Sequence, residues 1–166
     1  MPGYVIHIAT AQEYLKKHNS VENVDEFIKG VIYPDSTSDK STTHYGISSG
    51  YSNIGKFLES NKIDTSFNRG YFLHLITDYL FYNYYLDKFS KDIYNDYDII
   101  NARLIEKYNV NLPIEVKDRV FFKHGETKVL NYNLACKVID EISNLDIDII
   151  AKESNEKKWN TYKWFI

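Results

Sequence analysis

Residues 70–86 read Gly-Tyr-Phe-Leu-His-Leu-Ile-Thr-Asp-Tyr-Leu-Phe-Tyr-Asn-Tyr-Tyr-Leu, and this stretch decides the fold. After Gly70 it contains no further glycine and no proline, and nearly every residue is apolar or aromatic. A helix that is hydrophobic on all sides is typical of the centre of a protein. We therefore predict a buried central helix that begins near residues 65–68 and continues to about residue 92.

Two ionisable residues, His74 and Asp78, interrupt this apolar run, and no Lys or Arg lies between residues 70 and 87. A helix brings residues four positions apart to one face, with Cβ atoms roughly 6 Å apart. An isolated buried carboxylate is costly, so Asp78 should be neutralised, paired or bound to a metal ion. His-x3-Asp is a short motif, so these two residues alone fit a buried hydrogen bond and a metal site equally well.

The composition fits a single domain over residues 1–166, which is long enough to bury a core without disulfide bonds. The net charge of −3 and the pI near 5.9 argue against a long nucleic acid held through its phosphates. The single cysteine, Cys136, excludes an intramolecular disulfide and fits a reducing compartment. No secretion signal and no membrane-spanning stretch are evident, so we expect a cytoplasmic protein.

Helical periodicity continues on both sides of the central stretch. Ser20 is the expected cap of the second helix, with Val24 on its buried face, and Pro34 should end that helix. No alternating strand pattern and no internal repeat is evident. We therefore predict an all-α fold, a compact bundle of about six or seven helices. Besides the central helix, the predicted helices cover residues 4–18, 20–33, 52–61, 94–108 and 126–143.

Three more residues carry side chains that can bind a metal ion. Asp35 and His44 bracket a polar loop after the second helix, and the two ends of such a loop can return to the same place. His7 lies beside the most aliphatic face of the first helix. Taken singly, each has an ordinary explanation, since Pro-Asp is a common turn signal and a lone histidine is commonly a core or boundary residue. Three imidazoles and two carboxylates together suit a metal such as Zn²⁺.

In order and local sequence, these residues resemble the zinc-dependent phospholipase C family, whose all-helical fold is shared with fungal single-strand-specific zinc nucleases. The resemblance implies that Asp35, His44, His74 and Asp78 hold one zinc ion. It also implies that Asp78 reaches a second ion, together with His7 and the N-terminal residue. The matching pieces, all in the first half of the chain, are the helix with His7, the Gly-x3-Pro-Asp segment at 30–35, Thr43-His44-Tyr45, and Gly-Tyr-Phe-Leu-His-Leu-Ile-Thr-Asp-Tyr at 70–79.

The chain departs from secreted members of that family in lacking a secretion signal, and it departs more sharply at the third zinc site. The third zinc of the family uses two histidines and a glutamate downstream of the His-x3-Asp motif. Here His124 is the single histidine after Asp78, and no His-x3-Glu pattern follows. We therefore expect one or two zinc ions.

The resemblance implies a metal-dependent phosphoric-ester hydrolase, a phospholipase C-like phosphodiesterase that uses a metal-activated water. Asp35 is then the candidate catalytic base, and the expected substrate is a small phosphodiester or a phospholipid head group. The alternative is a non-catalytic helical protein that retains a structural metal site, which closed four-ligand coordination would favour. A metal-dependent HD-type phosphohydrolase is a weaker alternative, because no histidine here is followed directly by aspartate.

The end of the chain, residues 157–166, mixes tryptophan, tyrosine and phenylalanine with lysine. Such residues suit a membrane interface, so peripheral membrane contact through this tail is one interpretation. Packing of the tail against the domain or a partner subunit is the commoner role.

Overall fold

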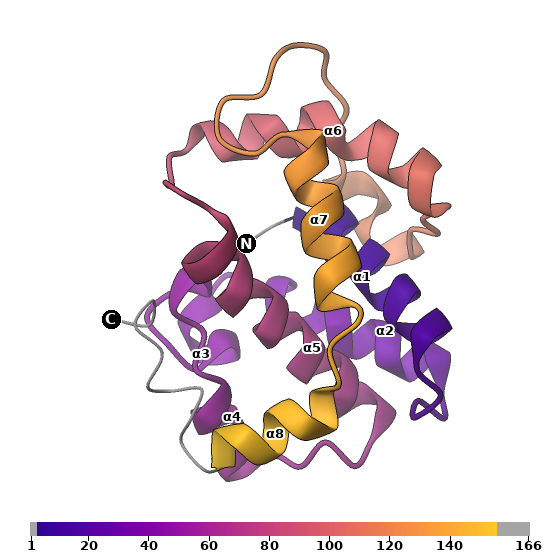
Figure 1. Cartoon of the computed structure of the whole chain (residues 1–166), viewed down its shortest axis with the longest axis vertical. Coiled ribbons are helices and arrows are strands. Elements are labelled where there is room, and N and C mark those ends of the chain that lie inside the picture. The colour runs from indigo at the N-terminus through magenta and orange to yellow at the C-terminus, as the bar shows by residue number, and fades with distance from the viewer. Residues whose placement is uncertain (1–2, 156–166) are drawn as a thin grey trace.

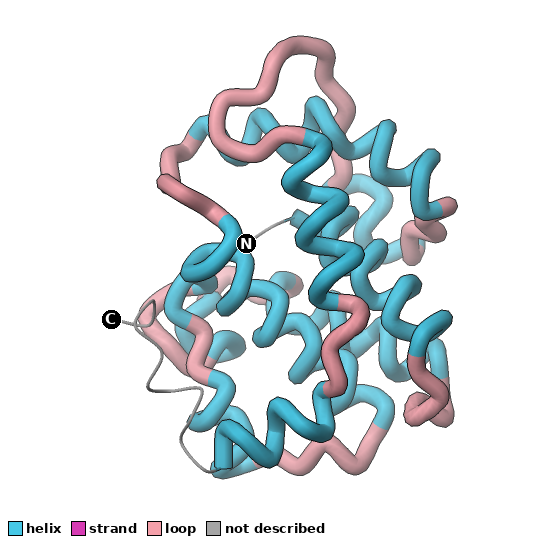
Figure 2. Tube along the Cα trace, in the orientation of Figure 1, coloured by secondary structure: helices cyan, strands magenta, loops and turns pink. Residues whose placement is uncertain are grey.

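The computed structural model describes residues 3–155, and every regular element in this range is a helix (Figures 1 and 2). The predicted all-α fold is confirmed. The described residues form eight α-helices rather than six or seven, and short 3-10 or π turns lie between some of them. The α-helices are α1 (Gly3–Lys17), α2 (Val24–Ile32), α3 (Lys40–His44), α4 (Ile54–Ser60), α5 (Ser66–Leu80), α6 (Asp92–Tyr108), α7 (Tyr132–Ile142) and α8 (Ile147–Asn155).

The predicted central helix is α5, and helices α1, α2, α4 and α8 contact it (Figure 1). Every residue from Gly70 to Leu80 is buried, as the apolar sequence requires. Thr65 begins the helix, because its side chain accepts a hydrogen bond from the backbone N–H of Asn68 at 3.1 Å. The prediction was wrong about its end: α5 stops at Leu80, a π turn follows, and the helical path is over at residue 85. Residues 87–89 are exposed, so no burial holds a further helical turn there.

Two glycines allow α2 and α5 to cross with their backbones in contact. A Cβ atom on Gly30 would overlap the carbonyl oxygen of Phe67, and a Cβ atom on Gly70 would overlap that of Phe27. Neither glycine has a positive φ, so the requirement is for space rather than for an unusual conformation. The contact brings the last turn of α2 against the part of α5 that carries His74.

The N-terminal half differs from the prediction at the start of α2 and in the presence of α3. Asn23, rather than Ser20, begins α2, since its side chain accepts a hydrogen bond from the N–H of Glu26 at 3.1 Å. As a result Val24 lies in the first turn with 52% of its surface exposed, and not on the buried face. The short helix α3 was not predicted, and Asp39 caps it by accepting a hydrogen bond from the N–H of Ser41.

The C-terminal half contains a further difference, because α7 begins at residue 132 and not at 126. The buried carboxylate of Asp96 on α6 accepts hydrogen bonds from the backbone N–H groups of Lys128 (3.0 Å), Val129 (2.7 Å) and Leu130 (2.8 Å). This tertiary contact holds the segment as a loop. Helix α8 was not predicted either, and its Ile147 and Ile150 are buried in the core.

Replacing Asp96 by Asn should therefore destabilise the fold by about 2 kcal/mol, because the amide keeps one acceptor oxygen for three backbone N–H groups and loses the charge. Chemical denaturation would measure the change. Asp98→Asn, on the same helix, is the control: its ion pair with Lys123 at 3.4 Å is partly exposed and should contribute less than about 1 kcal/mol. Equal stability of the two variants would show that Asp96 does not hold the loop.

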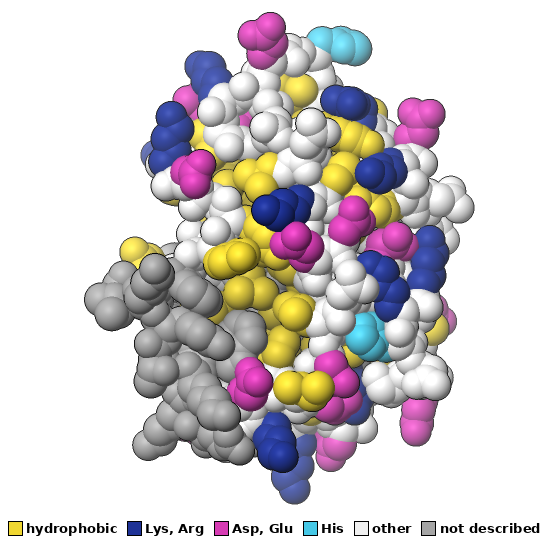
Figure 3. Space-filling view, viewed as in Figure 1, with side chains coloured by type: hydrophobic (Ala, Val, Ile, Leu, Met, Phe, Trp, Pro, Cys, Tyr) yellow, Lys and Arg dark blue, Asp and Glu magenta, His cyan; other side chains and the backbone are white. Residues whose placement is uncertain are grey.

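In the surface view, acidic and basic side chains are interspersed, and hydrophobic side chains gather beside α7 (Figure 3). No area of a single charge extends across this face. Among the described helices, none combines the length and the apolar character that a membrane crossing needs.

Candidate metal centre

The structure brings the five predicted residues to one point, although they come from four separate segments. Helix α1 supplies His7, and the 3-10 turn after α2 supplies Asp35. The end of α3 supplies His44, and α5 supplies His74 and Asp78. The central carboxylate is that of Asp78: its Oδ2 lies 2.8 Å from Nε2 of His44 and 3.1 Å from Nε2 of His74, and its Oδ1 lies 3.0 Å from Nε2 of His7.

Asp35 closes the opposite side of the same cluster. Its Oδ1 lies 3.5 Å from Nε2 of His44, and its Oδ2 lies 3.6 Å from Nε2 of His74. The two Nε2 atoms are 3.3 Å apart. Ligand atoms bound tetrahedrally to zinc are about 3.4 Å from one another, given bonds of about 2.1 Å. One ligand atom from each of Asp35, His44, His74 and Asp78 lies within 4.8 Å of the others, so these four residues could hold a metal ion.

The tautomers of the two histidines can be assigned from their outer hydrogen bonds. Nδ1 of His44 donates to the carbonyl oxygen of Lys40 at 2.9 Å, and Nδ1 of His74 donates to that of Val31 at 2.6 Å. A carbonyl oxygen only accepts, so each Nδ1 carries a proton and Nε2 of the neutral ring presents a lone pair to the cluster. Histidine ligands of metals are typically oriented in this way.

The two carboxylates add further hydrogen-bond acceptors to the two Nε2 atoms of the cluster. The side chains of Asp35 and Asp78 are fully buried, and one oxygen of each, Oδ2, has no hydrogen-bond partner among the described residues. A buried acceptor without a donor is costly, and two buried negative charges are more so. The donor set therefore fits a cation at its centre, and two nitrogens with two oxygens are ligands that zinc accepts.

Without the metal, protons must supply part of the missing positive charge. Burial alone would lower the pKa of His74, but the negative charges of Asp78 and Asp35 raise it above its usual value. Burial would likewise raise the pKa of Asp78, yet the neighbouring imidazoles hold it well below its usual range. The cluster thus favours an ionised Asp78 beside a positive charge, whether that charge is a proton on His74 or a metal ion.

His7 lies at the edge of this cluster. Its ring stacks on that of His74, with centroids 3.7 Å apart and planes 6° from parallel. Burial, and then the positive charge of His74, lower the pKa of His7 to about 4, so that it stays neutral near pH 7. Its Nδ1 is buried and has no hydrogen-bond partner within residues 3–155. His7 therefore reaches the cluster through Asp78, and its expected role at a second metal ion stays a prediction.

Two residues that the sequence analysis did not single out hold Asp35 in place. The hydroxyl of Tyr4 donates to the carbonyl oxygen of Asp35 at 2.9 Å. The ammonium of Lys40 donates to the same oxygen at 2.7 Å and to Oδ1 at 3.3 Å. Asp35 also lines a cavity of about 380 Å³, which we call the Asp35 cavity; Tyr94 and Arg119 lie on its wall. Lys40 could have been noticed as a cation five positions after Asp35. The polar segment between them, however, does not indicate that the side chain of Lys40 turns toward Asp35.

The remaining predicted features lie elsewhere. His124 is exposed in the loop before α7. The N-terminal residue and the aromatic tail at 157–166 fall outside the described residues.

No family model, curated protein or solved structure matches this chain. The resemblance to zinc-dependent phospholipases C therefore rests on the sequence pieces quoted above, and the function must be argued from the geometry of the centre.

Proposed function

We propose that this protein is a metal-dependent phosphoric-ester hydrolase of the phospholipase C-like type, with zinc held in the cluster formed by Asp35, His44, His74 and Asp78. Three features support the proposal: the four side chains form a buried set of acceptors, their spacing suits one ion, and their order along the chain resembles that of a zinc phosphodiesterase family. The expected substrate is a small phosphodiester or a phospholipid head group.

One observation carries the choice of an enzyme. Asp35 belongs to the cluster and is also one of the residues that line the Asp35 cavity, although its side chain is fully buried, so this cavity is the approach that we propose for water and substrate. Catalytic zinc sites keep a position for water or substrate, whereas structural sites are closed by four protein ligands.

The proposed reaction divides between the ion and the protein. A zinc ion held by the residues of the cluster would supply the chemistry of a Lewis acid, which lowers the pKa of water from 15.7 toward about 7 and polarises a phosphoryl oxygen. Asp35 is the candidate base that would accept the proton of the attacking water. In that role it would not bind the ion, which His44, His74 and Asp78 would hold with a position left for water. The carbonyl oxygens of Val31 and Lys40 keep His74 and His44 in the tautomer whose Nε2 faces inward.

A second candidate is a helical protein that keeps a structural metal ion without catalysis. It is favoured by the burial of the four side chains, none of which exposes more than about 1% of its surface. In this case all four residues bind the ion at once, and no position is left for water.

Hydrolysis of bis(p-nitrophenyl) phosphate should distinguish the two. We expect the zinc-loaded protein to hydrolyse the diester, a chelator to abolish the activity, and added Zn²⁺ to restore it. His124→Ala is the control, because this exposed histidine lies outside the cluster and its loss should leave both metal content and activity unchanged. A protein shown by elemental analysis to carry zinc, yet inert on lipid, nucleotide and chromogenic diesters, would favour the structural role.

A further inference from the structure

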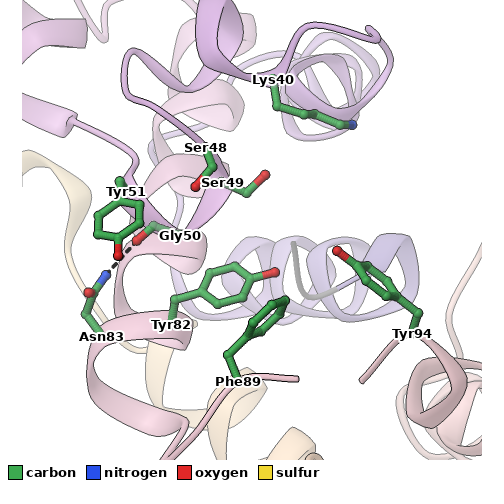
Figure 4. Close-up of a pocket in the computed structure, with 9 residues that line it drawn as sticks. All are labelled: Lys40, Ser48, Ser49, Gly50, Tyr51, Tyr82, Asn83, Phe89 and Tyr94. Carbon is green, nitrogen blue, oxygen red and sulfur yellow. Dashed lines mark hydrogen bonds between the residues drawn. The ribbon is translucent and has the colours of Figure 1, made fainter. Parts of the chain in front are cut away.

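Figure 4 shows a second cavity, which we call the aromatic pocket and which is lined in part by Lys40, the lysine that contacts Asp35. It encloses about 520 Å³, which is within the usual range of small-molecule sites. Figure 4 shows Lys40 on one side of it, Ser48 and Ser49 on another, and the rings of Tyr82, Phe89 and Tyr94 along the opposite wall. The pocket therefore combines one cation, two serine hydroxyl groups, the amide of Asn83 and four aromatic rings, the fourth being that of Tyr51.

Two residues connect this pocket to the metal centre. Lys40 lines the pocket and places its Nζ 3.3 Å from Oδ1 of Asp35. Tyr94 lies on the wall of both the aromatic pocket and the Asp35 cavity. The two cavities therefore adjoin at Tyr94, and Lys40 connects the aromatic pocket to Asp35.

The charges of the centre make Lys40 important for an anionic ligand. Two ionised carboxylates, neutral histidines and one divalent ion add up to no net charge, so the ion and its ligands alone attract an anion weakly. The ammonium of Lys40 adds a positive charge at the rim of the cluster, and about 29% of its side chain is exposed. Its Nζ already donates to the carbonyl oxygen and to Oδ1 of Asp35, so Lys40 would attract phosphate mainly as a point charge.

Two of the aromatic rings that line the pocket are not part of the buried hydrophobic core. Phe89 exposes 56% of its surface and Tyr94 exposes 49%. The ring of Phe89 meets that of Tyr82 edge to face, with centroids 5.8 Å apart, and Tyr82 in turn packs on the core. Exposed aromatic rings that line a concave surface commonly mark a binding site.

We propose that Lys40 binds the phosphoryl group of the substrate, and that the aromatic pocket holds an apolar or aromatic organic group of the same ester. The inference rests on the proposed function for the position of the reacting centre. Aromatic rings also attract quaternary ammonium groups. Here, however, the ammonium of Lys40 at the rim repels a second cation, so the pocket selects neutral groups over choline-like ones.

Binding to zinc-loaded protein, measured by calorimetry, tests the role of Lys40 without requiring turnover. Orthophosphate is the first probe, and we expect Lys40→Met to weaken its binding about 10- to 100-fold, as for the loss of a hydrogen bond between charged groups. Lys40→Arg should keep most of the affinity. Lys56→Met, at an exposed lysine on α4, is the matched control and should bind phosphate like the wild type.

Phenyl phosphate and phosphocholine test the pocket. The wild type should bind phenyl phosphate more tightly than orthophosphate, and phosphocholine no more tightly than orthophosphate. Phe89→Ala should reduce the advantage of phenyl phosphate and leave orthophosphate binding unchanged, since orthophosphate has no organic group for the ring to contact.

Several outcomes would overturn the inference. They are equal phosphate affinity of the wild type and Lys40→Met, no phosphate binding by the zinc-loaded wild type, or tighter binding of phosphocholine than of phenyl phosphate. Loss of zinc from Lys40→Met would also overturn it, because Lys40 would then act through the ligand Asp35. Lys40-dependent phosphate binding by a protein that hydrolyses no diester would instead uphold the inference and reject the proposed function.

Discussion

Asp78→Asn is expected to lose its metal ion and most of the stability that the ion provides. Asparagine has nearly the shape of aspartate and can still form a hydrogen bond with His74, so loss of packing contributes little. Its amide oxygen, however, is a poor zinc ligand and cannot balance the charge of the ion. Metal that binds only the folded state contributes about 4 kcal/mol when free metal is a thousand times Kd, or roughly 10 °C in melting temperature for a chain of this size.

Thermal unfolding with and without chelator, together with elemental analysis, would measure this effect. The chelator should lower the melting temperature of the wild type and change that of Asp78→Asn far less. Asp118→Asn, at an exposed position outside the cluster, should respond to chelator like the wild type. If the wild type melts at the same temperature before and after proven removal of metal, the His74–Asp78 pair serves packing alone.

Gly70→Ala is expected to destabilise the protein by about 3 kcal/mol or more, although alanine is the better helix former. The added methyl group would overlap the carbonyl oxygen of Phe27, and a backbone atom cannot turn aside as a side chain can. Helices α2 and α5 must then move apart. Gly30→Ala should behave alike, because its methyl group would meet the carbonyl oxygen of Phe67.

Urea unfolding of these variants would test the crossing. The control is Gly50→Ala, where the new methyl group would lie 3.5 Å from the nearest atom of Tyr82, an ordinary contact. We expect that variant to stay within about 0.5 kcal/mol of the wild type. Comparable stability of Gly70→Ala and Gly50→Ala would mean that the two helices have room to separate.

The sequence predicts those elements whose causes are local. The apolar run at 70–80 buries itself as α5, and the periodicity of residues 94–108 agrees closely with α6. The start of α7 could not be predicted, because the carboxylate that holds residues 128–130 outside a helix belongs to Asp96, more than thirty positions away. The end of α5 was missed since the apolar pattern continues past the point where the chain leaves the core.

In the candidate site, too, the sequence predicts the features with local causes and not those that depend on tertiary packing. The spacing of His74 and Asp78 places both on one face of a helix, so their proximity is a local property. The approach of His7 and His44 depends on how separate segments pack, and only the family resemblance indicated it. The carbonyl oxygens that orient the histidines belong to Val31 and Lys40, and no side chain in the sequence identifies such backbone partners.

The crossing of α2 and α5 also has a thermodynamic consequence for ion capture. Val31, whose carbonyl oxygen holds Nδ1 of His74, directly follows Gly30, so the backbone contact between the helices fixes how that imidazole is presented. A ring held in this way has already lost its rotamer freedom during folding, and the entropy of ordering it does not oppose binding again. Part of the ligand set is therefore already in its binding orientation before the ion arrives. A small change in the spacing of α2 and α5 would alter the affinity for the ion without changing any group that binds it.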